Sequence, residues 1–349
     1  MRGVGRRILI TGIASFWGGR IAQALESHPD VEVIVGLDSD APVVALERTE
    51  FVRADETYSI LARLVTATQV DTVVHAGMIV DSTRGGDRRI HELNTIGTLN
   101  LLAAVGAAGS PVRSLIVKSS TLVYGAGPKD PYWFSEKTPR VAPARTRVER
   151  SLLEVESYLN AFVEDNRQVR TVTLRFASVL GADIDTPLGR ALTLPLAPRI
   201  AGFDPQIQFV AQDDVVRALV FAVEQENLSG IFNVAGAGRI PWSEVLALAG
   251  KAPFLLPPFA TGLALAPLSR IGLGMAPEII DLLRYGRGVD TRKLLRAGFS
   301  YTHSSLSALQ EFVEGRRLKA VVGEIVPTYR YEADVEAFFR HSPAVVTPN

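Results

Sequence analysis

The sequence predicts an α/β fold, a Rossmann-type doubly wound parallel sheet with a smaller C-terminal domain. In the first half, short runs of Val, Ile and Leu alternate with segments of helical periodicity. The runs are nearly continuous in apolar residues, as expected of strands that are covered on both faces. Strands are predicted at residues 7–10, 31–37, 51–53, 71–75, 115–117 and 172–176. This alternation of strands and helices is typical of a parallel, doubly wound sheet.

The second half is less regular. Strands are predicted at 208–210 and 231–234, on either side of a helix from Asp214 to Gln225. The segment from Pro187 to Pro205 is rich in Pro, Leu and Ala, which predicts a loop over a cleft. The stretch from Ala252 to Ser269 carries no charge but contains four prolines, so it is a poor candidate for a membrane helix. We expect it to be buried or to line a substrate site, with a peripheral membrane contact as the alternative.

Composition excludes several classes of protein. The chain has 349 residues, with 37 Lys plus Arg against 37 Asp plus Glu, so bulk charge does not direct it to nucleic acid. The absence of cysteine excludes disulfides, a thiol nucleophile and a Cys-ligated metal, and a cytoplasmic location is the simpler expectation. The five histidines lack metal-ligand spacing, so we expect no metal.

A glycine-containing turn lies between the first predicted strand and the first predicted helix. Gly12 permits a tight turn and close approach of a pyrophosphate, and Gly18 permits close packing of the helix on the strand. The helix N-terminus offers free N–H groups to that anion. Asp38 ends the second strand, 20 residues after Gly18, where its carboxylate can accept hydrogen bonds from ribose hydroxyls. A 2′-phosphate would meet this negative charge, so the turn predicts NAD rather than NADP.

Over residues 7–310 these motifs resemble the extended short-chain dehydrogenase/reductase family, the NAD-dependent epimerases and dehydratases. The matches include the turn (with Ser15 at the place of a middle glycine), Asp71–Gly77, Lys118–Gly125, Leu174–Gly181 and Val289–Thr291. The resemblance implies one set of contacts to NAD. These come from Gly12, Ser15, Phe16, Trp17, Gly18, Asp38, Asp55, His75, Ala76, Gly77, Asn94 and Ser119.

The resemblance also implies a catalytic Ser or Thr after the fifth strand and a Tyr-x-x-x-Lys pair on the next helix. Ser120 matches the first, whereas Thr146 and Arg150 stand at the Tyr and Lys positions. Arg150 can bind a ribose hydroxyl but cannot relay a proton, and the Thr146 hydroxyl is a poor base. Lys118 and Tyr124 are the candidate substitutes. Substrate contacts are expected from Tyr124, Ala177, Ser178 and Val179.

Three interpretations remain open. The chain is a nucleotide-sugar (UDP-hexose) epimerase or dehydratase with a relocated base, a catalytically degenerate protein that binds NAD and a nucleotide sugar, or an NAD-dependent dehydrogenase of a hydrophobic alcohol. The last is suggested by the apolar run from Phe254 to Leu268. The resemblance implies a homodimer that uses the helix carrying Thr146–Glu154. We expect an NAD-binding domain over 1–180 to which 208–235 return, a substrate-binding domain mainly over 181–310, and an extension over 311–349.

Overall fold

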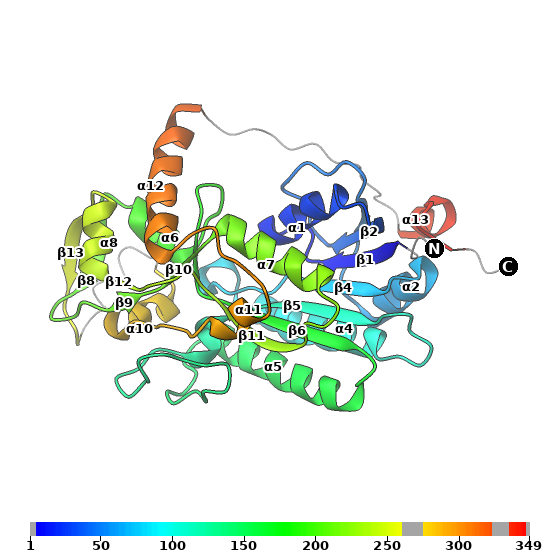
Figure 1. Cartoon of the computed structure of the whole chain (residues 1–349), viewed down its shortest axis with the longest axis horizontal. Coiled ribbons are helices and arrows are strands. Elements are labelled where there is room, and N and C mark those ends of the chain that lie inside the picture. The colour runs from blue at the N-terminus through cyan, green and yellow to red at the C-terminus, as the bar shows by residue number, and fades with distance from the viewer. Residues whose placement is uncertain (1–4, 260–274, 323–334, 347–349) are drawn as a thin grey trace.

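A seven-stranded, all-parallel sheet forms the centre of the molecule in the computed structural model, which describes residues 5–259, 275–322 and 335–346. The strand order is β11-β6-β5-β4-β1-β2-β3, the doubly wound order (Figure 1). The strands are β1 (Arg6–Thr11), β2 (Val31–Asp38), β3 (Glu50–Arg53), β4 (Thr72–His75), β5 (Ser114–Ser120), β6 (Arg170–Phe176) and β11 (Gly230–Val234). The predicted fold class is therefore confirmed.

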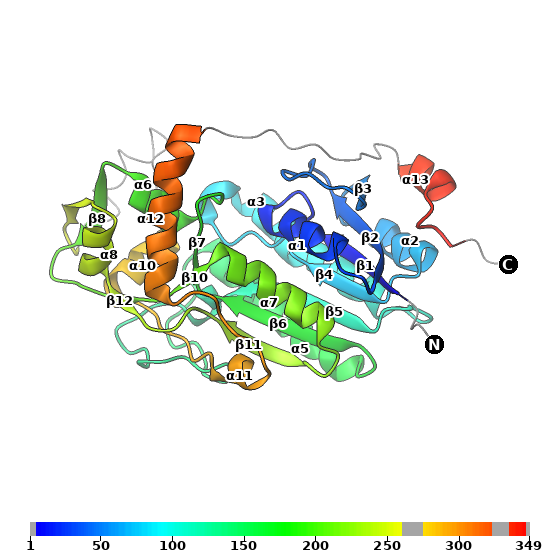
Figure 2. The same cartoon turned by 45° about the horizontal axis from the view of Figure 1, so that its top comes forward.

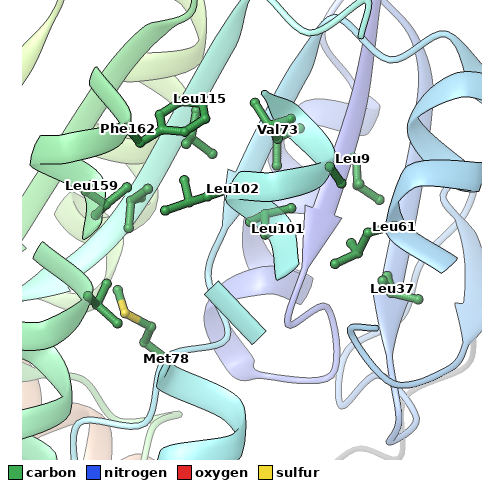
Figure 3. Packing of buried hydrophobic residues seen from close by; sticks show 14 of the residues in the cluster. Leu9, Leu37, Leu61, Val73, Met78, Leu101, Leu102, Leu115, Leu159 and Phe162 are labelled. Atoms are coloured by element: carbon green, nitrogen blue, oxygen red, sulfur yellow. The ribbon is translucent and has the colours of Figure 1, made fainter. Parts of the chain in front are cut away.

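Helices cover both faces of this sheet (Figure 2). One face packs against α1 (Phe16–Glu26) and α7 (Gln212–Glu224), whose buried residues share a hydrophobic cluster with the strands. The other face is covered by α2 (Tyr58–Thr68), α3 (Asp87–Ile90), the π-helical segment η2 (His91–Gly97), α4 (Thr98–Val105) and α5 (Arg147–Asp165). Figure 3 shows Leu101 and Leu102 of α4 packed between Leu61 of α2 and Leu159 of α5. These two apolar layers explain why the strands are apolar on both sides.

The second part of the chain packs around a core of its own. Trp242, Phe209 and Leu309 are fully buried there, and the indole Nε1 of Trp242 donates a hydrogen bond to the Pro198 carbonyl at 2.8 Å. Three two-stranded pairs build the frame: β7 (Ser178–Leu180) with β10 (Phe209–Ala211), β9 (Gln206–Ile207) with β12 (Ile240–Pro241), and β8 (Leu196–Ile200) with β13 (Ala252–Leu256). The helices are α6 (Pro187–Thr193), α8 (Trp242–Leu248), α10 (Pro277–Tyr285), α11 (Arg292–Arg296) and α12 (Ser305–Val322).

Two sequence-based expectations need correction in this part. The segment 187–205 is not a loop throughout, because Thr186 caps α6, Pro187 occupies its first turn, and β8 follows. The start of the uncharged stretch is not buried either, since Phe254 and Leu255 on β13 are exposed. Residues 260–269 of that stretch lie outside the described residues. No helix in the described ranges is long and apolar enough to cross a bilayer.

The chain returns at its C-terminal side to the half that contains the central sheet. The helix α13 (Val335–His341) packs near α2 and β3, at the opposite end of the molecule from α12 (Figures 1 and 2). Phe338 is completely buried in the cluster that contains α2 and α4. The Arg63 guanidinium donates to both carboxylate oxygens of Glu336 and lies 3.8 Å from the centroid of the Phe339 ring. The last described residues therefore complete the core under β3.

We predict that Phe338→Ala lowers the free energy of unfolding by about 3–5 kcal/mol, because it removes a fully buried ring and leaves a cavity. Urea denaturation followed by circular dichroism measures this loss. Phe259→Ala is the matched control, since that ring is 96% exposed and its removal should leave the midpoint nearly unchanged. Equal midpoints for the two variants would show that α13 does not hold the core together.

Candidate active site

The turn after β1 is packed closely against the segment that follows β4 and against the start of α1. Gly12 has φ +74°, and a Cβ built on it would lie 2.2 Å from the Gly77 Cα. A Cβ on Gly18 would lie 2.2 Å from the Gly12 carbonyl oxygen, so α1 rests directly on the turn. Ser15 replaces a glycine with a helix cap, because its Oγ accepts from the Gly18 N–H at 3.1 Å and donates to the Gly12 carbonyl at 2.6 Å.

The N-terminus of α1 offers an anion site. Among the described residues, the backbone N–H groups of Phe16 and Trp17 make no hydrogen bond. They lie at the positive end of an eleven-residue helix, an arrangement that suits a phosphate.

Asp38 lies at the end of β2, beside the turn. Its Oδ2 accepts from the Ala14 N–H at 3.0 Å and its Oδ1 accepts from the Asp40 N–H at 3.1 Å, which fixes the carboxylate and leaves lone pairs for a further donor. Burial raises the pKa of Asp38. Asp55, which follows β3, is exposed to solvent. Glu56 was missed by sequence reasoning; burial and the neighbouring Asp38 raise its pKa to about 8.

Two residues that the resemblance assigned to the cofactor lie in the protein interior. His75 Nδ1 is 2.6 Å from Thr11 Oγ1 and its Nε2 is 3.1 Å from Thr98 Oγ1. Burial lowers the pKa of His75 to about 4, so the ring is neutral. The Asn94 amide is completely buried and bonds both the N–H and the carbonyl of Ile79. These side chains hold the segment after β4, including Ala76 and Gly77, rather than facing the cleft.

A cleft lies between the carboxyl ends of the strands and the second part of the chain, which is where open α/β sheets bind ligands. It encloses about 640 Å³, including the part open to solvent. From the sheet side it is lined by Trp17, Val80, Lys118, Ser119, Ser120, Thr121, Leu122, Phe176, Ala177, Ser178 and Val179. From the other side it is lined by Thr186, Pro187, Leu188, Glu278, Ile279, Leu282 and Arg287. Ser120, Lys118, Trp17 and the expected substrate residues 177–179 are thus brought together.

Lys118 and Ser120 lie two residues apart on β5 and both line the cleft. The Ser120 Oγ accepts from the Leu122 N–H at 3.2 Å, at the start of the short helix η3 (Thr121–Tyr124), so its own proton is available to a ligand. Lys118 is 3% exposed, and its Nζ lies 5.6 Å from the centroid of the Trp17 ring. Among the described residues it has no hydrogen bond and no carboxylate partner. Burial lowers its pKa to about 8.

Tyr124 belongs to a buried network below the cleft. Its hydroxyl donates to Asn233 Oδ1 and accepts from Arg175 Nη1, both at 2.7 Å. The Arg175 guanidinium pairs with the Glu156 carboxylate, which also accepts from the Ser119 Oγ at 2.7 Å. Burial raises the pKa of Tyr124. The hydroxyl that sequence reasoning offered as a substitute base is therefore occupied on both sides, and the side chain of Ser119 is turned toward α5.

The start of α5 does not reach the cleft. Thr146 is the helix cap: its Oγ1 accepts from the Glu149 N–H at 3.1 Å, and the Glu149 carboxylate accepts from the Thr146 N–H at 3.1 Å. Glu149 also pairs with the partly buried Arg140 at 2.7 Å. Arg150 is exposed and donates to the Arg145 carbonyl at 3.0 Å. Of the described residues that line the cleft, none comes from this helix. Thr146 and Arg150 are therefore not among the described residues that line the cleft with Ser120.

Two charged residues of the cleft were missed because no motif marks them. Glu278, on α10, accepts from the N–H of Ser82 at 2.9 Å and from its Oγ at 2.8 Å, which joins the two halves of the chain across the cleft. Burial raises its pKa. Arg287 follows α10 and is almost completely buried. No cluster of three or more acidic, His or Cys side chains suited to a metal occurs within the described ranges.

The fold and the cleft define a dinucleotide-binding α/β protein with a second lobe over the ends of its strands. Residues 8–235 match the model of the NAD dependent epimerase/dehydratase family. An uncharacterized protein of Mycobacterium tuberculosis is 31% identical over 323 residues, which cover 90% of this chain and 85% of that protein. The chain belongs to the NAD-dependent epimerase/dehydratase family.

Other relatives are more distant. The UDP-glucose 4-epimerase of Erwinia amylovora is 30% identical over 193 residues, which cover 52% of this chain and 56% of the relative. Among solved structures, UDP-glucose 4-epimerase of Thermotoga maritima with UDP-glucose has a TM-score of 0.70 at 20% identity, over 90% of this chain and 99% of that one. UDP-glucuronic acid 4-epimerase of Bacillus cereus with NAD has a TM-score of 0.68 at 18% identity, over 89% and 99%. The structural likeness shows a common fold.

NAD is the cofactor of this family, and the residues present fit it. The turn at Gly12 and the free N–H groups of α1 suit its pyrophosphate, and the fixed carboxylate of Asp38 suits a ribose diol.

We predict that Asp38→Asn weakens NAD binding about tenfold, because a charge-assisted hydrogen bond to the ribose becomes a neutral one. The same change removes the charge that repels a 2′-phosphate, so the ratio of the affinities for NAD and NADP should decrease. Isothermal titration with both dinucleotides measures this. Unchanged affinity for NAD would remove Asp38 from the cofactor site.

We also predict that Thr146→Ala lowers the free energy of unfolding by about 1 kcal/mol through loss of the helix cap. Thr146→Ser keeps the capping oxygen and should restore the stability. Thermal unfolding compares the two variants. If Thr146 instead handled a proton of the substrate, Thr146→Ala would abolish turnover while its stability changed little.

Proposed function

We propose that this chain is an NAD-dependent epimerase or dehydratase of a nucleotide sugar, a UDP-hexose, in which Lys118 and Ser120 handle the substrate proton. The observation that carries this proposal is the buried Lys118 amine in the cleft, on the same strand as Ser120 and without a counter-ion among the described residues. The family and the UDP-sugar epimerases among its relatives support the class of substrate.

The residues supply two elements of the chemistry. NAD, when bound, accepts a hydride from a carbinol carbon, and the hydroxyl on that carbon must lose its proton. Lys118 takes that proton in its amine form, which burial makes available near pH 8. The Ser120 hydroxyl, anchored by the Leu122 N–H, orients the substrate oxygen. The ammonium of Lys118 could then give the proton back to the substrate oxygen when the alcohol forms again.

A second candidate is a protein that binds NAD and a nucleotide sugar without turning the sugar over. It is favoured by the start of α5, where a capping box and the Arg140–Glu149 ion pair stand in place of a proton relay. A hydrophobic alcohol has less support, because Phe254 and Leu255 are exposed on β13 and do not line the cleft. Residues 260–268 of that run lie outside the described residues.

The homodimer and the cytoplasmic location remain predictions.

We predict that Lys118→Met reduces NADH formation from NAD and UDP-hexoses at least 100-fold with little change in NAD affinity. In the wild type the rate should rise as the pH rises through about 8, because the neutral amine is the active form. Lys118→Arg keeps the charge but cannot release its proton, so it should be equally inactive. Stopped-flow absorbance at several pH values measures these rates.

Lys129→Met is the control, since Lys129 is exposed and does not line the cleft. Full activity of Lys118→Met with an unchanged pH profile would disprove the role of Lys118. Binding of both ligands without any NADH would favour the second candidate.

A further inference from the structure

Glu56 places a carboxyl group close to the turn at Gly12. A Cβ built on Gly77, the residue against which Gly12 packs, would lie 3.7 Å from Glu56 Oε1. A Cβ built on Gly97 would lie 3.0 Å from Glu56 Oε2. The carboxyl group therefore lies between the segment after β4 and the helical segment η2. Glu56 is partly exposed to solvent, so a ligand bound at the turn can reach it.

The immediate neighbours of this carboxyl group are mostly neutral. The Thr11 hydroxyl at the end of β1 hydrogen-bonds to it and also lies 2.6 Å from His75 Nδ1. His75 is uncharged, because burial lowers its pKa to about 4. Asn100 from α4 donates to the backbone carbonyl of Glu56 at 2.9 Å and not to its carboxyl group.

The cations of this region have other partners. On β3, Arg53 donates to the Ser39 carbonyl at 2.9 Å. On α3, Arg89 pairs with Asp40 at 3.1 Å. No Lys or Arg among the described residues forms an ion pair with Glu56, so a negative charge there would have no counter-ion.

Asp38 is the charged neighbour that acts on Glu56. Burial and the Asp38 carboxylate raise the pKa of Glu56 to about 8. Asp38 is the better suited of the two to carry a charge, because its oxygens accept from the N–H groups of Ala14 and Asp40. The Glu56 carboxyl group accepts from no backbone N–H in the described part of the chain. At neutral pH the proton therefore stays on Glu56.

The protonation state of Glu56 matters for a dinucleotide, because its pyrophosphate brings further negative charge to the turn. An ionised Glu56 would repel this anion, since like charges in a partly buried site are poorly screened. A protonated Glu56 carries no charge and has an O–H that it can donate to a ribose or phosphate oxygen.

We propose that Glu56 binds NAD as an uncharged carboxylic acid, so that each NAD bound requires a proton on this residue. Asp38 and Glu56 then have opposite roles. The ionised carboxylate of Asp38 accepts from ribose hydroxyls, and the protonated carboxyl group of Glu56 donates to an oxygen of the dinucleotide. NAD binding should weaken as the pH rises and Glu56 loses its proton.

The test is calorimetry of NAD binding to the full chain at pH 7 and pH 9, with no sugar nucleotide present. The dissociation constant should be about tenfold higher at pH 9, because the protonated fraction of a group with a pKa of about 8 falls about tenfold between these values. Titrations in buffers of different ionisation enthalpy should show uptake of about one proton per NAD at pH 9 and almost none at pH 7.

Glu56→Gln keeps the size of the side chain and a hydrogen-bond donor but cannot ionise. It should bind NAD equally well at both pH values and take up no proton. Its Tm without NAD at pH 9 should exceed that of the wild type, because a buried charge without a counter-ion is absent. Glu164→Gln is the matched control, since Glu164 is exposed on α5, and it should keep the pH dependence of the wild type.

Lys118 needs a separate variant, because burial lowers its pKa to about 8 as well. Loss of its positive charge would also weaken the binding of an anion at high pH. In Lys118→Met the pH dependence and the proton uptake should persist, since Glu56 is unchanged.

Three results would overturn the proposal. One is an NAD affinity of the wild type that is the same at pH 7 and pH 9. Another is the pH dependence of the wild type in Glu56→Gln. The third is loss of the pH dependence in Lys118→Met, which would assign the proton to Lys118. Because no sugar takes part, the proposed function is tested separately by NADH formation, and either proposal can fail without the other.

Discussion

The buried ion pair between Arg175 and Glu156 holds the floor of the cleft together. Arg175 comes from β6 and Glu156 from α5, and both side chains are about nine-tenths buried. Through Tyr124 the network continues to Asn233 on β11, whose amide donates to the carbonyls of Phe134 and Asp290 at 3.1 and 3.3 Å. A buried guanidinium and carboxylate satisfied in this way fix their neighbours in one arrangement, because any partial opening leaves a charge without a partner. The ends of β5, β6 and β11 are thereby held in register below the cleft.

This network also explains which groups face the cleft. The hydroxyls of Ser119 and Tyr124 are hydrogen-bonded to Glu156, Arg175 and Asn233. They therefore point away from the cleft, which other atoms of Ser119 line. Residues of the opposite pleat, Lys118 and Ser120, are left to face it. The first turn of α5 is likewise occupied by its own cap. In the proposed function, the proton-handling groups therefore come from β5 rather than from the helix that the family pattern uses.

Much of the fold could be predicted from the sequence, because buried parallel strands and a glycine turn leave local signals. The turn at Gly12 and the strand ending at Asp38 are examples. The direction in which a side chain points was harder to predict from the sequence. Spacing placed His75 at a strand end, but only the packing of β4 shows that its ring faces Thr98.

Glu278 left no local signal, and Arg287 lies two residues before the matched segment Val289–Thr291 without belonging to it. Glu278 and Arg287 meet the cleft through contacts with Ser82 and Thr121, which are more than 150 residues away in the chain. Such contacts depend on the whole topology, so no sequence window contains them. The spacing of Thr146 and Arg150 likewise shows that they lie one turn apart at the start of one helix. It does not show whether that turn lines the cleft with Ser120.

The docking of α13 sets an order of assembly for this molecule. Phe338 fills the core beneath α2 and β3, yet it is synthesised after the entire second lobe. The nucleotide-binding half therefore emerges from the ribosome with an unfilled apolar site, which only a segment made much later can close. Domains often fold in the order of their synthesis. Here the hydrophobic core of the first half is complete only after the second half has been synthesised, so the two halves finish folding together.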